Sequence, residues 1–210
     1  MRRPLLLSLA LLFVTAAPAL VRAEDGFKPL FDGRTLEGWE GNEKLWSVVD
    51  GAIVGTTDNV EPIKKNTFLA TKKNYKNFTL KAKFKLRNGN SGIQFRSKTF
   101  PEFVVRGYQA DIAESRYTGI LYEEGFRSTI LSDVKPEEVA KHVKQDDWNE
   151  YVITADGPKI TQTINGFTTV DYTEKDDVKG AKEGVIALQL HVTEKPMRVS
   201  FKDVEIRELP

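Results

Sequence analysis

The sequence contains no cysteine and only two histidines among its 210 residues. Without cysteine, disulfide bonds, thiolate metal sites and a cysteine nucleophile are excluded. Basic and acidic residues nearly cancel, with 31 Lys and Arg against 30 Asp and Glu. Because no run of basic residues occurs either, nucleic acid is not expected as a partner. Stability must come from a buried core, for which the chain is long enough.

Long hydrophobic runs are also scarce, and the one present lies at the N-terminus. Arg2 and Arg3 precede an apolar run over residues 5–17, and Val21-Arg22-Ala23 places small residues at the third-last and last positions before a cleavage point. This layout predicts a secretory signal peptide over residues 1–23, since the run is short for a membrane span. A retained anchor is the alternative. We expect a single domain over residues 24–210 and a periplasmic or secreted protein without stable membrane insertion after cleavage.

Helix signals are few, and alternation of apolar and polar residues dominates. Phe78 to Leu86 alternates apolar residues with Thr and Lys, which predicts a strand with one buried and one solvated face. Asn165-Gly166 and Asp50-Gly51 predict tight hairpins, and a change of phase near Lys202-Asp203 indicates a β-bulge. Residues 136–143 carry the best helix signal, because Pro and acidic residues suit a helix start. The pattern predicts an antiparallel, all-β sandwich with at most one or two short helices.

Three strand-like segments carry polar residues two positions apart. Residues i and i+2 share one face of a strand, while the apolar neighbours face a core. If the three strands share a sheet, their polar residues gather on one face as a site. The alternative is a hydrogen-bonded network that stabilises a curved sheet. The pairs are Gln94 with Arg96, Gln109 with Asp111, and Gln189 with His191.

A glycine-containing loop adds further candidates next to these strands. Residues 121–127 bring together a phenol, carboxylates and a guanidinium from Tyr122, Glu123, Glu124 and Arg127. If the segment is extended, Glu123 and Glu124 point in opposite directions, so only one of them faces the site. His191 suits an acid/base role or a metal-ligand role, and the alternative is a structural histidine. The other histidine, His142, is expected at the surface.

The order and spacing of short motifs resemble the 3-keto-disaccharide hydrolase family over residues 27–209. The resemblance implies a concanavalin/laminin-G-like jelly-roll β-sandwich and an exported protein that acts on oxidised sugars. The motifs are Leu30-Phe31-Asp32-Gly33, Gly38-Trp39, Asn90-Ser91-Gly92-Ile93, Gly107-Tyr108-Gln109-Ala110-Asp111-Ile112, Thr118-Gly119, Trp148-Asn149 and the segment from Gly184 to His191.

The activity that the resemblance implies is cleavage of 3-keto glycosides. A ketone at C3 acidifies the proton at C2, so a base and an oxyanion stabiliser suffice for elimination, after which water adds. The resemblance assigns catalytic roles to His191, Asp111 and one of Glu123 and Glu124. The residues expected to bind the sugar are Arg96, Gln94, Gln109, Gln189, Tyr122 and Arg127. Many relatives have Glu and Gln where this chain has Gln109 and Asp111, which moves the carboxylate by one position along the stripe.

Two other functions fit the same residues. One is a non-catalytic carbohydrate-binding module on the same fold, and the other is an ordinary glycoside hydrolase that uses Asp111 with Glu123 or Glu124. In each case the expected ligand is a carbohydrate. No cofactor follows from the sequence with certainty, although Asp111, a loop Glu and His191 together would suit a divalent metal ion.

Overall fold

A computed structural model describes residues 26–58, 60–114 and 116–210 of the chain. The predicted signal peptide over residues 1–23 lies outside the described residues. None of the described helices is long and apolar enough to cross a membrane.

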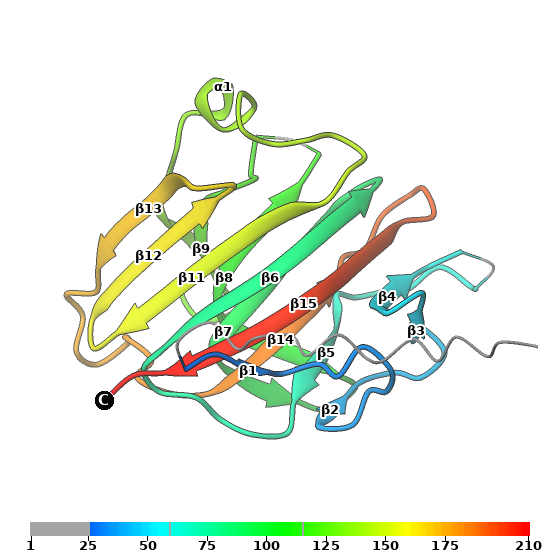
Figure 1. The fold of residues 1–210 in the computed structure, drawn as a ribbon, viewed down its shortest axis with the longest axis horizontal. Helices are drawn as coiled ribbons and strands as arrows, with labels where there is room; N and C mark the ends of the chain where they lie inside the picture. The colour runs from blue at the N-terminus through cyan, green and yellow to red at the C-terminus, as the bar shows by residue number, and fades with distance from the viewer. Residues whose placement is uncertain (1–25, 59, 115) are drawn as a thin grey trace, which may run out of the picture.

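The described residues form two antiparallel sheets that pack face to face (Figure 1). Sheet A has the order β13-β12-β11-β6-β15-β4-β3, with β1 also paired to β15. Its strands are β1 (Lys28–Pro29), β3 (Trp46–Val49), β4 (Ala52–Thr56), β6 (Phe78–Arg87), β11 (Asn149–Asp156), β12 (Lys159–Ile164), β13 (Phe167–Thr173) and β15 (Arg198–Glu208).

Sheet B has the order β10-β9-β8-β7-β14-β5-β2, so the three strands predicted to carry the polar stripes are neighbours within it. Its strands are β2 (Trp39–Glu40), β5 (Thr67–Thr71), β7 (Asn90–Phe100), β8 (Val104–Ala113), β9 (Leu121–Glu124), β10 (Thr129–Ser132) and β14 (Val185–Leu190). The short helix α1 (Pro136–Val139) lies in the connection from β10 to β11. The prediction of an antiparallel sandwich is therefore confirmed.

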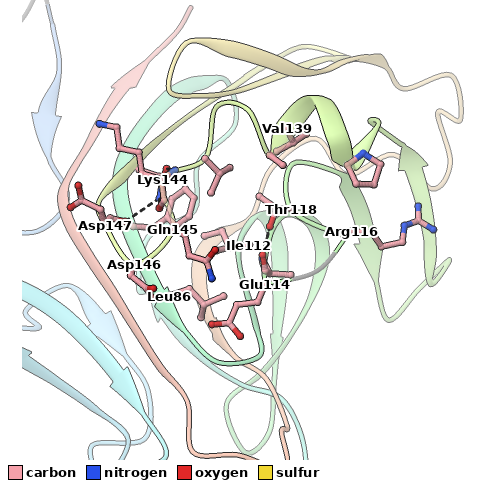
Figure 2. A pocket seen from close by; sticks show the side chains of 16 residues that line it. Leu86, Ile112, Glu114, Arg116, Thr118, Val139, Lys144, Gln145, Asp146 and Asp147 are labelled. Carbon is pink, nitrogen blue, oxygen red and sulfur yellow. Dashed lines mark hydrogen bonds between the residues drawn. The ribbon is translucent and has the colours of Figure 1, made fainter.

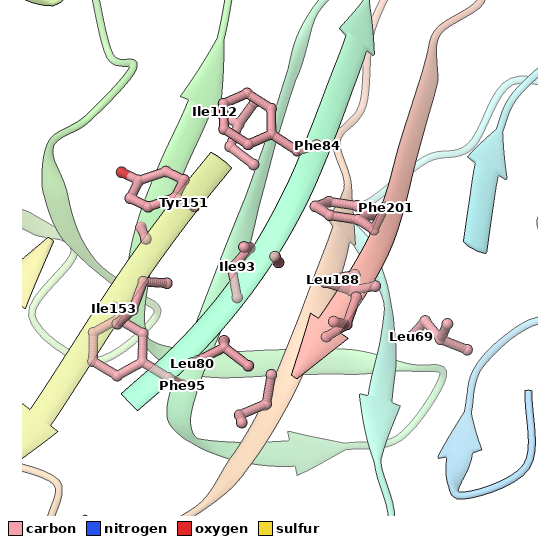
Figure 3. Packing of buried hydrophobic residues seen from close by; sticks show 14 of the residues in the cluster. Leu69, Leu80, Phe84, Ile93, Phe95, Ile112, Tyr151, Ile153, Leu188 and Phe201 are labelled. Carbon is pink, nitrogen blue, oxygen red and sulfur yellow. The ribbon is translucent and has the colours of Figure 1, made fainter. Parts of the chain in front are cut away.

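The core lies between the sheets and is built by the predicted alternation. Leu80, Phe84 and Phe201 from sheet A face Ile93 and Leu188 from sheet B, and all five are at most 3% exposed (Figure 3). Burial of side chains of this size contributes about 1.5–3 kcal/mol each. Because one face of each sheet is committed to this core, the alternate residues point outward from the sandwich.

Local turn chemistry also follows the sequence. Asn165 and Gly166 both have positive φ, at 49° and 83°, and join β12 to β13 as the hairpin signal predicts. Asp50 and Gly51 do the same between β3 and β4. In β15 the register with β6 shifts between Lys202 and Glu205, which confirms the predicted bulge. The helix predicted over residues 136–143 is shorter, with four residues in regular α-helix.

Candidate functional site

The outer face of sheet B, which points away from sheet A, collects amide and carboxyl side chains from three adjacent strands. In the register of the sheet, Gln94 of β7 lies opposite Gln109 of β8, and Gln109 lies opposite Tyr122 of β9. Asp111 and Glu124 lie on the same face, because each is two residues away from a member of this row. All of these side chains except Tyr122 are buried or largely covered.

A cavity of about 850 Å³ opens over this face. One part of its lining is polar and includes the predicted site residues, while Phe68, Val104 and Val105 form an apolar part. The lining comprises Lys65, Asn66, Phe68, Asn90, Val104, Val105, Arg106, Gln109, Asp111, Tyr117, Ile120, Tyr122, Glu124, Gly125, Ser128, Thr129, Ile130, Gln189 and His191. A cavity of this size and mixed lining suits a small ligand such as a mono- or disaccharide.

Glu124 is held by three side-chain amides. Its Oε2 accepts hydrogen bonds from Gln94 Nε2 at 2.9 Å and Gln189 Nε2 at 2.8 Å, and its Oε1 accepts one from Asn66 Nδ2 at 3.0 Å. Burial raises the pKa of Glu124, and the hydrogen bonds from Asn66 and Gln94 oppose this rise. The amides therefore fix a carboxylate in one orientation at the bottom of the cavity.

Asp111 differs from Glu124 in having fewer donors and deeper burial. Gln109 Nε2 donates a hydrogen bond to Asp111 Oδ1 at 3.0 Å, and the residue is 4% exposed. Burial raises the pKa of Asp111 to about 8, and the negative charge of Glu124 contributes to the same direction. At neutral pH Asp111 thus carries a proton that it can donate, beside a second carboxyl group that is better stabilised as an anion.

His191 lies just beyond the end of β14 and lines the same cavity. Its Nδ1 is 2.5 Å from the backbone oxygen of Val192. Because a carbonyl oxygen only accepts, Nδ1 is the donor in this contact, which leaves Nε2 as the ring nitrogen that can accept a proton. The imidazole can then accept a proton from a group in the cavity.

Three amide oxygens at this face have no hydrogen-bond partner among the described residues: Asn90 Oδ1, Gln94 Oε1 and Gln189 Oε1. Buried acceptors are normally paired with protein or solvent donors. Asn90 and Gln189 line the cavity, but the three oxygens themselves are buried. They are therefore unpaired acceptors within the face and not on its surface.

The structure separates Arg96 from the other predicted residues. Arg96 has a φ of 48° and lies where the register between β7 and β8 shifts, so the alternation fails at this residue. Its guanidinium donates to the backbone oxygens of Lys76 and Gly157 and to Asn77 Oδ1. The prediction that Arg96 shares the face of Gln94 was wrong, because a β-bulge turns its side chain toward the connection from β5 to β6 and the connection from β11 to β12.

Glu123 and Arg127 are also remote from the cavity lining, because they form a separate buried cluster. Glu123 Oε2 accepts a hydrogen bond from the Arg127 backbone N–H at 2.5 Å, and Arg127 Nη2 lies 2.8 Å from Glu174 Oε2. Tyr108 Oη donates to the same Glu174 oxygen at 2.7 Å. Of the two adjacent glutamates, the strand therefore presents Glu124 to the cavity and Glu123 to the opposite face.

Several cavity residues were not predicted from the sequence. Asn66 donates to Glu124 and also accepts a hydrogen bond from the Val192 backbone N–H at 3.0 Å, so it joins the segment of His191 to the carboxylate. Arg106 and Tyr117 line the cavity. Asn66 precedes β5 in a connection without a periodic pattern, and only the pairing of β5 with β14 brings it to the site.

Gly92 is a further requirement of the site. It lies opposite Asp111 in the register, and a Cβ atom at this position would come within 2.6 Å of Gln109 Cγ. Glycine thus leaves the space in which the Gln109 side chain crosses toward β7 and reaches Asp111. In the sequence, Gly92 was noted only as part of the motif Asn90-Ser91-Gly92-Ile93.

Two alternatives to a sugar site on sheet B find less support. Among the described residues, no group of three or more His, Asp or Glu is arranged to hold a metal ion, so Asp111, Glu124 and His191 do not form a ligand set.

A second cavity of about 220 Å³ lies beside α1 (Figure 2). Its interior is lined by Leu86, Ile112 and Val139, and none of its described lining residues has a buried polar atom without a partner.

The family of 3-keto-alpha-glucoside-1,2-lyase-like domains matches residues 26–207. The chain belongs to this family. The match confirms the resemblance inferred from the short motifs and supports a carbohydrate-active protein. Among curated proteins, none matches this chain.

Solved structures share the fold. A proposed glycosyl hydrolase from Parabacteroides distasonis is 21% identical, with a TM-score of 0.64 over 88% of this chain and 94% of that one. The carbohydrate-binding module CBM66 from Bacillus subtilis is 14% identical, with a TM-score of 0.61 over 81% and 96%. The β-glucanase of Bacillus licheniformis is 10% identical, with a TM-score of 0.59 over 87% and 97%. At these identities the likeness shows the jelly-roll sandwich alone, as predicted.

Proposed function

We propose that the protein is an exported enzyme that cleaves 3-keto glycosides by elimination at C1 and C2 followed by hydration. The observation that carries this proposal is the pairing of Glu124, fixed by three amides, with Asp111, whose raised pKa of about 8 keeps it protonated at neutral pH. One group can remove a proton while the other donates one, within a single cavity. Family membership supports the choice of substrate.

In the proposed reaction Glu124 removes the proton from C2 of the keto sugar. The electron pair of the C2–H bond forms an enolate with the C3 carbonyl, and a hydrogen bond from the Asp111 carboxyl stabilises the developing charge on its oxygen. When the enolate collapses, the C3 carbonyl re-forms, a C1–C2 double bond forms and the C1–O glycosidic bond breaks. The departing oxygen takes up a proton as an alcohol, and water then adds across the double bond.

The remaining residues position the substrate in this scheme. His191 lines the same cavity, and its imidazole exchanges a proton with the departing oxygen or the attacking water. Gln189 and Asn90 line the cavity and would contact the bound sugar. Tyr122 supplies an aromatic wall. The export of the protein rests on the predicted signal peptide over residues 1–23.

An ordinary glycoside hydrolase is the second candidate, because one protonated and one ionised carboxyl group are also the catalytic pair of such enzymes. The test is incubation of the mature protein with an aryl 3-keto-glucoside and with its unoxidised parent. Release of the aryl alcohol from the keto compound alone supports the proposal. Release from the parent supports the ordinary hydrolase, and binding of sugar without release from either compound supports a non-catalytic module.

A further inference from the structure

The outer face of sheet A carries a hollow of about 370 Å³ that is unrelated to the cavity on sheet B. Its walls include Lys85, Arg87 and Arg198, together with Trp148. Ser200 lies directly opposite Lys85 on one side and Val54 on the other. Because Ser200 and Val54 are short, they leave a depression between the long side chains.

Like charges face each other across the strands at this hollow. Arg87 on β6 lies directly opposite Arg198 on β15, and both line the hollow. Like charges in directly opposed positions destabilise a sheet. The chain as a whole has a formal net charge of only +1, so this concentration of positive charge is local. Such an arrangement is expected where a negatively charged ligand compensates for the repulsion.

The charges at the hollow are only partly neutralised by the protein. Arg87 forms a bidentate contact with Asp58, with both oxygens 2.7 Å from Nη2, and Asp50 is the one carboxylate that lines the hollow. Lys85 and Arg198 make no hydrogen bond or ion pair with another side chain in the described part of the chain, although the charge of Asp58 also acts on Arg198. Lys85 is exposed. Two cations are thus available to an external anion.

Trp148 adds an aromatic surface beside these cations. The Lys202 ammonium lies 4.2 Å from the centre of its ring, so the indole is already held in place. An aromatic ring beside exposed cations suits a sugar ring that carries an anionic group, because the pyranose stacks on the indole while the anion contacts the cations. A bare polyanion would not require the aromatic ring.

We propose that the outer face of sheet A is a second carbohydrate site, which binds an acidic polysaccharide through Lys85, Arg198 and Trp148. The site lies on the opposite side of the sandwich from the cavity of Glu124. It would tether the protein to a polymer of uronic acid residues while the other face remains open to a small substrate. The inference is independent of the proposed function.

The test measures binding of the mature protein to polygalacturonate and to neutral dextran by affinity electrophoresis. We expect retardation by polygalacturonate alone, weaker at higher salt. The double variant Lys85→Gln/Arg198→Gln should weaken this binding by about fivefold to tenfold, and Trp148→Ala should weaken it as well. The control Lys72→Gln/Lys175→Gln removes the same charge from exposed positions elsewhere and should bind normally.

Three results would overturn the proposal: no binding of polygalacturonate, equal loss in the control double variant, or equal retardation by duplex DNA of matched charge. Glu124→Gln should bind the polymer like the wild type, and the Lys85→Gln/Arg198→Gln variant should cleave a 3-keto glucoside at the wild-type rate if the cavity has that activity. Failure of the proposed reaction is therefore distinguishable from failure of this second site.

Discussion

Gln189 Nε2 and Glu124 Oε2 are 2.8 Å apart, although two strands separate β14 from β9 in sheet B. Three strand spacings amount to roughly 14 Å across a flat sheet. Their contact therefore requires the two side chains to reach toward each other over a curved face. Gly107 lies opposite Glu124 on β8, and a Cβ atom there would come within 2.8 Å of Ser97 Cα on β7, so glycine permits the close approach of these two strands. The hydrogen bond spans the floor of the cavity and fixes its width.

The first prediction concerns the two adjacent glutamates. Glu124→Gln should lower the turnover of a 3-keto glucoside by at least about a hundredfold, because it removes the proposed base but preserves the size of the side chain. Glu123→Gln is the matched control, since its side chain contacts Arg127 on the other face. It should retain turnover and lose thermal stability. Equal rates for Glu124→Gln and the wild type would refute the role of Glu124.

The second prediction follows from the raised pKa of Asp111. A carboxyl group with a raised pKa in the folded state favours folding at a pH below its ordinary value of 3.8, and this contribution is lost as the pH rises toward about 8. As the pH rises from 3.8 to about 8, the melting temperature of the wild type should therefore fall relative to that of Asp111→Asn. A constant difference across this range, measured by calorimetry, would contradict the assignment.

The same group gives a third prediction for activity. Turnover by the wild type should fall as the pH rises through about 8, because Asp111 then loses the proton that stabilises the enolate.

Gly92→Ala would push Gln109 away from Asp111. The hydrogen bond from Gln109 lowers the pKa of Asp111. Loss of this hydrogen bond should therefore move the fall in turnover to a higher pH and reduce the rate by about tenfold. An unchanged pH profile in Gly92→Ala would count against Gln109 as a positioning residue.

The fourth prediction concerns His191. Because it is only partly buried and its single hydrogen bond joins it to the adjacent residue, His191→Ala should leave the melting temperature nearly unchanged. Turnover should fall by about a hundredfold if the imidazole exchanges a proton during the reaction. A large loss of stability would instead identify a structural histidine, and His142→Ala on the surface is the control for both measurements.

The fifth prediction separates the buried cluster of Arg127 from the cavity. Burial alone would raise the pKa of Glu174, but hydrogen bonds from Arg127, the Asp176 backbone and Tyr108 outweigh it and lower the pKa to about 2. This stability is present above the ordinary value of 4.5 and is lost as the pH falls through about 2. Glu174→Gln should therefore flatten the acid side of the stability curve.

At neutral pH the Glu174→Gln substitution should cost about 3 kcal/mol, because it removes the nearer of the two carboxylates that pair with the largely buried Arg127 guanidinium. Asp133→Asn, which breaks the exposed pair with Arg116, should cost less than about 1 kcal/mol. Both free energies of unfolding can be measured with urea. Similar costs for the two variants would show that the Arg127 cluster is not a stabilising element.

Most of the fold could be predicted from local sequence, because alternation and turn chemistry are short-range signals. The Asn165-Gly166 hairpin and the bulge near Asp203 required only a few neighbouring residues. The strand pairing that unites Gln94, Gln109 and Gln189 is long-range, yet the repeated spacing of polar residues indicated it. The same spacing failed at Arg96, because a bulge changes the parity of a strand and leaves no clear mark in its composition.

Site residues from connections could not be predicted in this way. Asn66 becomes a hydrogen-bond donor to Glu124 only through the pairing of β5 with β14, and no repeated spacing of residues in the sequence indicates this role. The choice between Glu123 and Glu124 depends on the register of β9 with β8, in which Glu124 lies opposite Gly107. Because successive residues of a strand point to opposite faces, one of the two had to face the cavity. The register of β9 with β8 decided which one.

The three donors that surround Glu124 are all carboxamides, and this has a consequence for the environment in which the protein can work. Carboxamides neither gain nor lose protons over the pH range of natural waters, whereas lysine or histidine donors would change with acidity. The export that we propose would expose the protein to the pH of its surroundings without the buffering of the cell. A carboxyl group held by amide donors keeps the same hydrogen-bond partners when that pH drifts, so a response of the cavity to acidity would come from the carboxyl groups of Asp111 and Glu124, whose pKa values burial raises.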